Sequence, residues 1–231
     1  MHSHILPQLD DGAKYIEETL KMLDIAYREG ITHIIATPHY KSGRYPADAR
    51  KLRNTLHRVQ LAARERNIPV TLYAGNEIFY NSELEAKLQS GALCTMNGTQ
   101  YVLIEFSPLE RYLYIRNAME DLLGMGYFPI LAHVERYQCL CQDISCVKEL
   151  KAMGCELQVN AGSVIGDNGW KVKRLVRRLL KEELVDYIGT DAHNTAGRKP
   201  AMKKCAAYLY RKCGRSYADA LLYGNARKRL T

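Results

Sequence analysis

The chain has 231 residues, of which 47% are hydrophobic and 25% charged, and its formal net charge is +8. This length suits one globular domain, or two at most, with a core large enough to need no disulfide or structural metal. The seven cysteines include no C-x-x-C pair, no leader precedes the opening histidines, and no apolar run spans a bilayer, so we expect free thiols, a cytoplasmic location and no membrane insertion.

The first half of the chain alternates predicted helices with predicted strands. Apolar side chains recur at helical spacing in residues 14–29 and 46–66, and a short capped helix is predicted over residues 81–91. Between them lie two apolar runs, ITHIIATP (31–38) and VTLYAGNEIFY (70–80), which are typical of strands buried on both faces.

The second half repeats this alternation. Strands are predicted over residues 101–106, 128–134, 156–160 and 186–191, and helices over residues 108–124, 143–153, 170–183, 200–213 and 216–229. Roughly seven βα units without a meander indicate a parallel sheet, and at this number a closed barrel. Because no linker-like stretch interrupts the pattern, residues 1–231 are expected to form a single domain.

Polar side chains gather at the C-terminal ends of these strands, where parallel barrels assemble their active sites. The chain opens with His2 and His4, and on a strand both imidazoles would point the same way and reach one metal ion. Further candidates follow along the chain: Asp11, His39, Glu77, Glu105, His133, Asp191 and His193. Imidazoles and carboxylates without thiolates suit Mn, Zn or Fe. Nine ligands exceed the need of one ion, so we expect two or three clustered ions that activate water for phosphoryl transfer.

Several short motifs carry a family resemblance from residue 2 to the end of the chain. Those that resemble the PHP (polymerase and histidinol phosphatase) superfamily are H-x-H at 2–4, DDG at 10–12, ATPH at 36–39, GNE at 75–77, IEF at 104–106, AHVER at 132–136, QVN at 158–160 and TDAH at 190–193. The most specific are HSHILPQLDDGAK and ATPHYKSGRY. They are similar to the manganese-dependent tyrosine phosphatases of bacterial capsule and exopolysaccharide operons, the CpsB/YwqE type.

The resemblance implies a distorted (β/α)7 TIM-like barrel with its metal site at the C-terminal ends of the strands. It implies two or three Mn²⁺ ions, with Fe, Zn, Mg or Co as alternatives, and hydrolysis of phosphotyrosine on the Tyr-rich tail of a cognate tyrosine kinase. The implied metal ligands are His2, His4, Asp11 rather than Asp10, His39, Glu77, Glu105, His133, Asp191 and His193. An oligomer is compatible with this function.

Other residues complete the expected site. Arg136 is implied as a phosphate clamp and Arg198 is a second candidate, since a guanidinium fork matches phosphate oxygens. Asp191 is also a candidate proton donor. Asn160 is a candidate orienter of a ligand or phosphate contact. A candidate substrate rim is formed by Lys41, Arg44 and Tyr45.

Two other functions remain open at this point. One is a PHP phosphatase of small molecules such as histidinol phosphate, which would share the metal site. The other is a non-catalytic regulator that binds the kinase. The second arises because Met1 directly precedes His2, where family members usually have two or three more apolar residues. A shortened first strand would lose hydrogen bonds that hold both histidines.

Three further features have simpler interpretations. Cys205 and Arg211 have the spacing of cysteine-dependent tyrosine phosphatases, but the AAYLY between them is helical and no glycine-rich phosphate loop, so no catalytic role is expected. His33 and His57 are expected to be structural.

Residues 198–231 carry ten Lys and Arg residues and one acid, and the simplest interpretation is a solvated basic face. An acidic partner, an anionic membrane surface and nucleic acid are the alternatives, nucleic acid being the weakest because no such motif is present.

Overall fold

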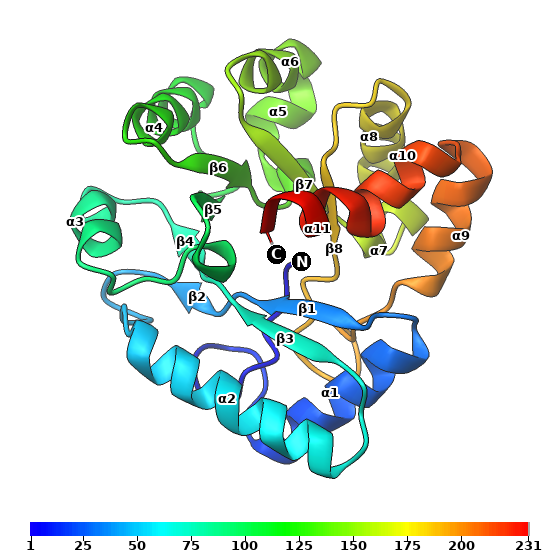
Figure 1. Ribbon diagram of the computed structural model, residues 1–231. Coiled ribbons are helices and arrows are strands. Elements are labelled where there is room, and N and C mark those ends of the chain that lie inside the picture. The colour runs from blue at the N-terminus through cyan, green and yellow to red at the C-terminus, as the bar shows by residue number, and fades with distance from the viewer. Residues whose placement is uncertain (231) are drawn as a thin grey trace. The chain divides into compact units, whose positions relative to one another are not determined.

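The computed structural model describes residues 1–230. The chain groups into two compact units: unit 1 comprises Met1–Gly98 and Thr190–Lys203, and unit 2 comprises Thr99–Gly189 and the chain from Lys204 onward. Both units are built from parallel strands and helices that alternate along the chain (Figure 1). The expectation of a single domain stays a prediction. Among the described residues, no helix is both long enough and apolar enough to cross a membrane.

Unit 1 contains two pairs of parallel strands. β1 (His33–Ala36) pairs with β3 (Thr71–Ala74), and β2 (His39–Tyr40) pairs with β4 (Glu77–Phe79). The single strand predicted over 70–80 is therefore divided in two, whereas the strand predicted over 31–38 is shortened to β1 and is followed by the additional short strand β2. The division matters for the site, because it places His39 and Glu77 opposite each other at the start of β2 and β4.

Local packing explains why β1 and β3 end where they do. Pro38 cannot donate a ladder hydrogen bond, and it lies between β1 and β2. At Gly75 an added Cβ would lie 3.0 Å from Sδ of Met96 and 3.1 Å from Cγ2 of Ile35, so a side chain there would require these neighbours to shift by a few tenths of an ångström. The side chain of Asn76 then donates to the carbonyl of Pro38 at 2.9 Å. This hydrogen bond joins the segment between β1 and β2 to the segment between β3 and β4.

Helices cover the outer face of β1 and β3. These are α1 (Ile16–Arg28) and α2 (Ala49–Glu65), which begin and end close to the predicted positions (Figure 1). Their apolar sides and those of the strands form one buried cluster that includes Leu23, Leu52 and Leu72. Each such side chain stabilises the fold by about 1.5–3 kcal/mol on burial. Unit 1 also contains the short helix α3 (Leu84–Gln89) and the 3-10 turn η1 (Met96–Gly98).

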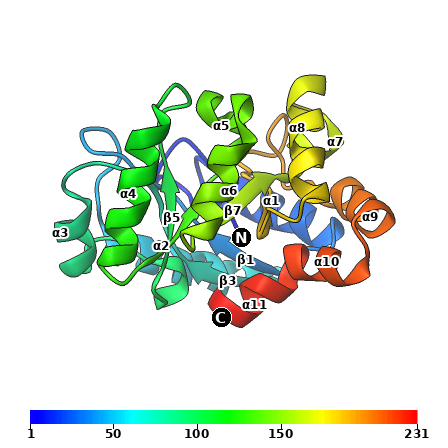
Figure 2. The ribbon, with the colours of Figure 1, turned by 90° about the horizontal axis from the view of Figure 1, so that it is seen from above.

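Unit 2 contains parallel strands in the order in which they occur in the chain. They are β5 (Tyr101–Glu105), β6 (Phe128–Leu131), β7 (Glu156–Asn160) and β8 (Tyr187–Gly189). The predicted helices appear as α4 (Tyr112–Gly124), α6 (Ile144–Ala152) and α8 (Trp170–Lys181), and Figure 2 shows α4 and α6 side by side. Short elements that the sequence analysis did not predict are η2 (Val134–Arg136), α5 (Gln138–Gln142) and α7 (Ala161–Ile165).

The last part of unit 2 is helical, as predicted. It consists of α9 (Lys203–Lys212), α10 (Arg215–Asp219), the π-helical turn η3 (Ala220–Gly224) and α11 (Asn225–Leu230). A half-buried ion pair anchors α11, because Nη1 of Arg229 lies 2.6 Å from Oε1 of Glu156. The hydroxyl of Tyr187 donates to the same carboxylate, and Asn225 donates to the carbonyl of Asp186 at 2.9 Å. Polar contacts therefore join α11 to β7 and β8.

Candidate metal centre

The segment around Ser3 is not the regular strand that the sequence predicted. Among the described residues, Ser3 forms an isolated parallel bridge with Ala192. Backbone hydrogen bonds nevertheless hold both sides of the segment: His4 donates to Ala192 at 2.8 Å, Asp191 donates to His2 at 3.0 Å, and Thr37 donates to Ser3 at 2.9 Å. The expected loss of hydrogen bonds is therefore not seen at these positions. Side chains still alternate, and Nε2 of His2 lies 3.2 Å from Nε2 of His4.

A first group of side chains in unit 1 surrounds Glu77. Its Oε2 lies 3.1 Å from Nε2 of His2, 3.1 Å from Nε2 of His4 and 3.1 Å from Nδ1 of His39. Oδ1 of Asp191 lies 3.6 Å from His2 and 3.5 Å from His4. One donor atom from each of His2, His4, Glu77 and Asp191 falls within 4.8 Å of the others, and all four residues are buried. Two carboxylates removed from water need a compensating positive charge, and this donor set fits a divalent cation.

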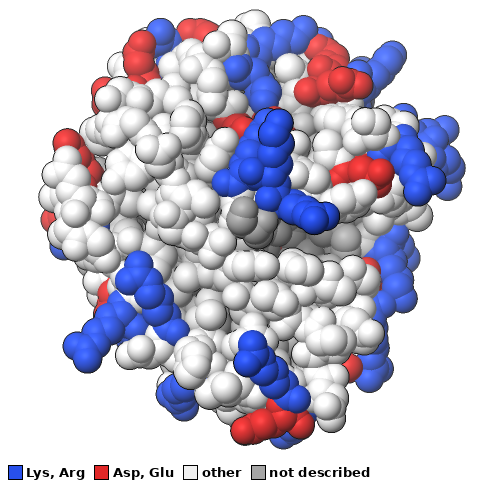
Figure 3. Space-filling model, viewed as in Figure 1, with Lys and Arg blue, Asp and Glu red and all other residues white. Residues whose placement is uncertain are grey.

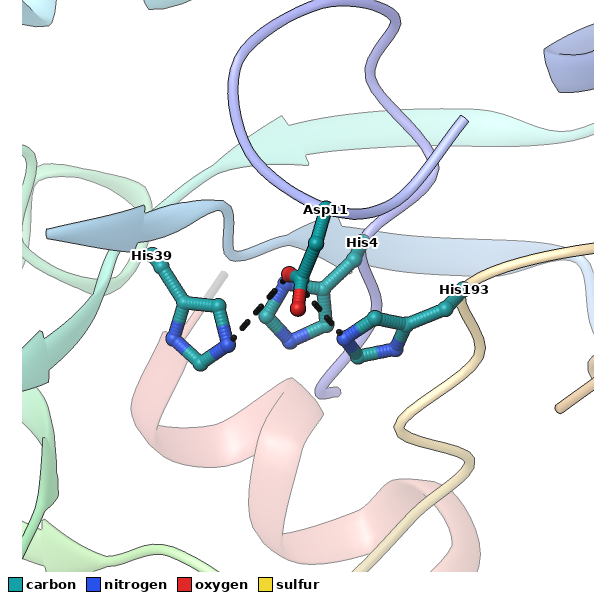
Figure 4. Close-up of side chains that lie close together, drawn as sticks. All are labelled: His4, Asp11, His39 and His193. Carbon is teal, nitrogen blue, oxygen red and sulfur yellow. Dashed lines mark ion pairs between the residues drawn. The ribbon is translucent and has the colours of Figure 1, made fainter. Parts of the chain in front are cut away.

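A second group shares His4 and adds Asp11, His39 and His193 (Figure 4). Oδ1 of Asp11 lies 3.7 Å from Nε2 of His39 and 3.6 Å from Nε2 of His193, and it points into the space between the imidazoles (Figure 4). The Asp11 side chain is 46% exposed, whereas that of His193 is 4% exposed. This group also fits a divalent cation, and its exposed side leaves room for water and substrate, as catalytic sites require.

Asp10, which the sequence analysis passed over in favour of Asp11, positions His4. Its Oδ2 lies 2.6 Å from Nδ1 of His4 and accepts the backbone N–H of His39 at 2.8 Å, while Oδ1 accepts that of Gly12 at 2.9 Å. Burial by itself would lower the pKa of His4, but the Asp10 carboxylate raises that pKa well above its usual value. Burial would raise the pKa of Asp10, yet the contact with His4 lowers it to about 2. Asp10 therefore holds a proton on Nδ1 and orients the ring so that Nε2 faces the group, where a bound cation would take the place of the second imidazolium proton.

The glycine of the DDG motif is required by a close backbone approach. A Cβ on Gly12 would lie 2.0 Å from the carbonyl oxygen of His4 and 2.8 Å from its Cβ. The next residue, Ala13, donates its N–H to that carbonyl at 3.2 Å. Any larger residue at position 12 would push the loop away from His4 and disturb the Asp10 contact.

We expect Asp10→Asn to weaken metal binding or turnover by about 10–100-fold, the usual contribution of a partner that orients a ligand histidine. The amide keeps the shape of the carboxylate but loses its charge, so the fold should persist. Titration of the protein with a divalent metal ion, together with kcat/KM, measures the effect. Asp24→Asn, at a partly exposed position of α1, is the matched control and should behave as wild type. Unchanged metal affinity in Asp10→Asn would contradict the positioning role.

Unit 2 carries the remaining predicted ligands, Glu105 and His133. Glu105 ends β5, His133 follows β6, and Oε1 of Glu105 lies 3.4 Å from Nε2 of His133. His133 has a left-handed backbone conformation, with φ 34° and ψ 58°. Asp191 in unit 1 is also left-handed, with φ 51°. This conformation costs about 1–3 kcal/mol in a residue other than glycine and is concentrated at functional sites.

Buried polar side chains support the turn at His133. The backbone N–H of His133 donates to Oε1 of Gln158 at 2.8 Å, and Nε2 of Gln158 donates to Oδ1 of Asn160 at 2.8 Å. Asn160 therefore supports the turn at His133 through Gln158. Glu135 accepts the N–H of Asn160 at 2.9 Å and the hydroxyl of Ser163 at 2.7 Å. The sequence analysis missed Gln158 and Glu135, although a glutamine inside an apolar strand was a usable signal.

The two predicted phosphate-binding arginines lie in different units. Nη2 of Arg198 in unit 1 lies 2.8 Å from Oδ1 of Asp191, and this side chain is 44% exposed. Arg136 in unit 2 ends η2, three residues after His133, and is also exposed. An incoming anion can reach an exposed guanidinium next to a predicted ligand.

The predicted rim lies beside His39 in unit 1. Tyr45 stacks on His39 with ring centroids 5.7 Å apart and planes 10° apart. The guanidinium of Arg44 lies 4.9 Å from the centre of the Tyr45 ring, and Nζ of Lys41 lies 3.9 Å from that of Phe79. Cations and an aromatic face are thus presented at the edge of the second group.

Cys205 has the helical environment that the sequence predicted. It lies in α9 and is 1% exposed, and burial raises the pKa of its thiol to about 12. A cysteine nucleophile needs the opposite shift, toward the thiolate. The histidines expected to be structural, His33 in β1 and His57 in α2, have exposed side chains.

Replacing Cys205 with serine is accordingly expected to leave phosphatase turnover nearly unchanged, at a stability cost of about 1 kcal/mol for a polar group in the core. Steady-state kinetics and thermal unfolding of the variant measure the two effects. A collapse of kcat in a variant that unfolds near the wild-type temperature would support a cysteine mechanism.

Comparison with known proteins gives a consistent result. The chain matches the family described as capsular polysaccharide synthesis, CpsB/CapC, over residues 1–231. It is 31% identical to the tyrosine-protein phosphatase CpsB of Streptococcus agalactiae serotype V, over 98% of this chain and 95% of that protein. It is 33% identical to the tyrosine-protein phosphatase YwqE of Bacillus subtilis, over 86% of this chain and 78% of that protein.

Solved structures show similar folds. The chain superposes with a TM-score of 0.93 on a structure from a study of YwqE and CpsB, described there as metal-dependent tyrosine phosphatases. The sequence identity is 31%, and the match covers 99% of this chain and 92% of the other. A histidinol phosphate phosphatase from Lactococcus lactis, solved with zinc, L-histidinol and phosphate, has a TM-score of 0.58 at 12% identity. At that identity the likeness shows a shared fold alone.

Proposed function

Because the chain belongs to the CpsB/CapC family of capsular polysaccharide synthesis, we infer that it is a metal-dependent tyrosine-protein phosphatase whose substrate is a phosphoprotein. The observation that carries this function is the buried set of imidazoles and carboxylates around Glu77. The family, the α/β fold of the PHP type and the tyrosine phosphatase activity predicted from the sequence are confirmed.

We propose that two or three divalent ions, Mn²⁺ in the cell, bind to the predicted nitrogen and oxygen ligands. The proposed ligands are His2, His4, Asp11, His39, Glu77, Glu105, His133, Asp191 and His193. Support comes from the donor chemistry, which contains no thiolate, and from the short distances within each unit. When bound, such ions lower the pKa of a coordinated water and stabilise charge on phosphate oxygens.

The chain's own residues prepare the reaction. We propose that Arg136 and Arg198 bind phosphate oxygens, because both guanidinium groups are exposed next to proposed ligands. Asp10 holds the proton on Nδ1 of His4 and directs Nε2 at the group, where binding of a cation would displace the proton from that nitrogen. A tyrosyl oxygen is a good leaving group and needs little proton donation. We propose Asp191 as the residue that supplies a proton where one is needed.

The rim suits an aromatic phosphate ester on a peptide. We propose that Tyr45, stacked on His39, packs against the substrate tyrosine, while Lys41 and Arg44 attract its negative charge. The proposed physiological substrate is the Tyr-rich tail of a cognate bacterial tyrosine kinase. The support is the family's place in capsule synthesis together with the cations that border the site.

One comparison tests this function against its alternatives. The protein should hydrolyse a phosphotyrosine peptide with a higher kcat/KM than histidinol phosphate, and its metal content should be measured in the same sample. A preference for histidinol phosphate would indicate a small-molecule phosphatase. Few bound ions and no activity after addition of Mn²⁺ would indicate a regulator that binds the kinase without catalysis.

Replacing Arg136 with lysine is expected to reduce transition-state binding by about 1–3 kcal/mol, because a lysine cannot make the two parallel hydrogen bonds of a guanidinium. The measured quantity is kcat/KM with a phosphotyrosine peptide, where about 1.4 kcal/mol is tenfold. Arg211→Lys, an exposed change on α9, is the control and should have no effect. Wild-type kinetics for Arg136→Lys would remove this residue from the site.

A further inference from the structure

Two neighbouring helices give unit 2 a strongly basic face. Six of the twelve residues of α8 are Lys or Arg, and neither α8 nor α9 contains an acidic residue. The helices are in contact, since Cζ of Arg177 in α8 lies 4.3 Å from the ring centre of Tyr208 in α9. In Figure 3, Lys and Arg side chains gather along the edge of the molecule where α8 to α10 lie. α8 thus adds its own cations to those of α9, which belong to the basic segment noted at the end of the sequence.

The basic residues form a stripe with an aromatic end. In α8, Trp170 is followed at helical spacing by Arg174, Arg177 and Lys181, so these four side chains share one side of the helix. In α9, cations flank the contact residue Tyr208 at one helical turn in either direction. The side chain of Trp170 is 67% exposed. We call this surface the basic stripe and define it as Trp170, Arg174, Arg177, Lys181, Lys204 and Arg211.

Glu182, which directly follows α8, pairs with cations outside the stripe. Glu182 lies 2.9 Å from Nε of Arg178 and 2.7 Å from Nζ of Lys148. Within residues 1–230, no ion pair joins an acidic side chain to a cation of the basic stripe. The stripe therefore presents uncompensated positive charge to solvent.

We propose that the basic stripe docks this protein onto the surface of an anionic lipid bilayer. Lys and Arg on one side of a helix are attracted to acidic phospholipids, each cation strengthening the attraction. An acidic protein segment would use the same cations, but it gives no reason for a large exposed indole at the end of the row. Tryptophan prefers the boundary between headgroups and hydrocarbon, which lies next to the anionic surface.

The position of the stripe makes this docking useful. α8 begins after β7 and α7, so Trp170 lies toward the C-terminal ends of the parallel strands of unit 2. Glu105 and His133 lie at that same edge of the unit. A bilayer bound at Trp170 would hold this edge near the membrane surface. Hydrolysis is not required for docking, so the proposal is independent of the proposed function.

The protein carries its own probe for the first experiment, because Trp170 is its single tryptophan. The full-length protein is mixed with vesicles of phosphatidylcholine alone, or of phosphatidylcholine with phosphatidylglycerol. With the anionic vesicles we expect a blue shift of tryptophan emission and protection from acrylamide, both reversed at high ionic strength. With neutral vesicles we expect no change. Absence of the shift with anionic vesicles would overturn the proposal.

Substitutions in the basic stripe test whether this surface is the one that binds the vesicles. The triple change Arg174→Gln, Lys181→Gln and Arg211→Gln is expected to lower partitioning onto anionic vesicles about a hundredfold, roughly fivefold for each cation removed. The control removes three exposed arginines of α2, by Arg50→Gln, Arg58→Gln and Arg64→Gln, and should bind as wild type. Circular dichroism checks that each variant folds. An equal loss of vesicle binding in both triple variants would overturn the proposal. Binding of the protein to a polyglutamate peptide, without binding to anionic vesicles, would overturn it as well.

Discussion

Replacing Glu77 with glutamine is expected to abolish phosphatase activity and to release bound metal. Oε2 of Glu77 lies 3.1 Å from a ring nitrogen of each of His2, His4 and His39, so it is the carboxylate that the first group shares. The amide keeps the size of the side chain but removes the negative charge that attracts a cation. Changes to the hydrogen-bonding partners of metal ligands already cost about 10–100-fold, and loss of a ligand charge should exceed that range.

Metal content by elemental analysis and kcat/KM with a phosphotyrosine peptide should be measured on the same preparation of the Glu77→Gln variant. Glu85→Gln is the matched control, since that glutamate is exposed on α3 and contacts Gln89. The control should retain both metal and activity. If the Glu77 variant kept its metal and its turnover, the first group would not be the metal centre.

Chelation is expected to lower turnover by more than about a hundredfold, because bound divalent ions contribute several kcal/mol to the stabilisation of a phosphoryl-transfer transition state. Addition of Mn²⁺ after removal of the chelator should restore activity. The same titration with Fe, Zn, Mg and Co salts ranks the alternatives to manganese. Circular dichroism of the chelated protein provides the control, because the core of each unit should remain folded without metal.

Activity that is indifferent to the chelator would contradict a metal mechanism. The buried thiol of Cys205 offers no substitute for one, because its raised pKa keeps it protonated. If only a metal other than Mn²⁺ restored activity, the metal mechanism would stand and only the identity of the proposed ion would change. The experiment therefore separates the metal-dependent chemistry from the identity of the ion.

The sequence predicted the larger elements because each one carries its own periodicity. Apolar residues at helical spacing identified α1 and α2 to within a few residues of their ends. The division of the predicted strand 70–80 was missed, because it falls where the backbone of Gly75 is packed close to the side chains of Ile35 and Met96. Residues so far apart in the sequence leave no local pattern that marks the break.

The candidate site shows the same limit. The sequence by itself identified the candidate ligands, because histidines and carboxylates follow the predicted strands and parallel strands bring their C-terminal ends together. Buried carboxylates at that edge require a compensating positive charge, so the sequence also predicted a metal site. The tertiary structure alone showed that Asp10 and not Asp11 supports His4, since Asp10 is held by the N–H of His39, a residue that lies 29 positions away. It also assigned Gln158 to the turn at His133. The local sequence shows the residue types and their periodicity. Which residues distant in the chain become hydrogen-bonding partners depends on tertiary packing.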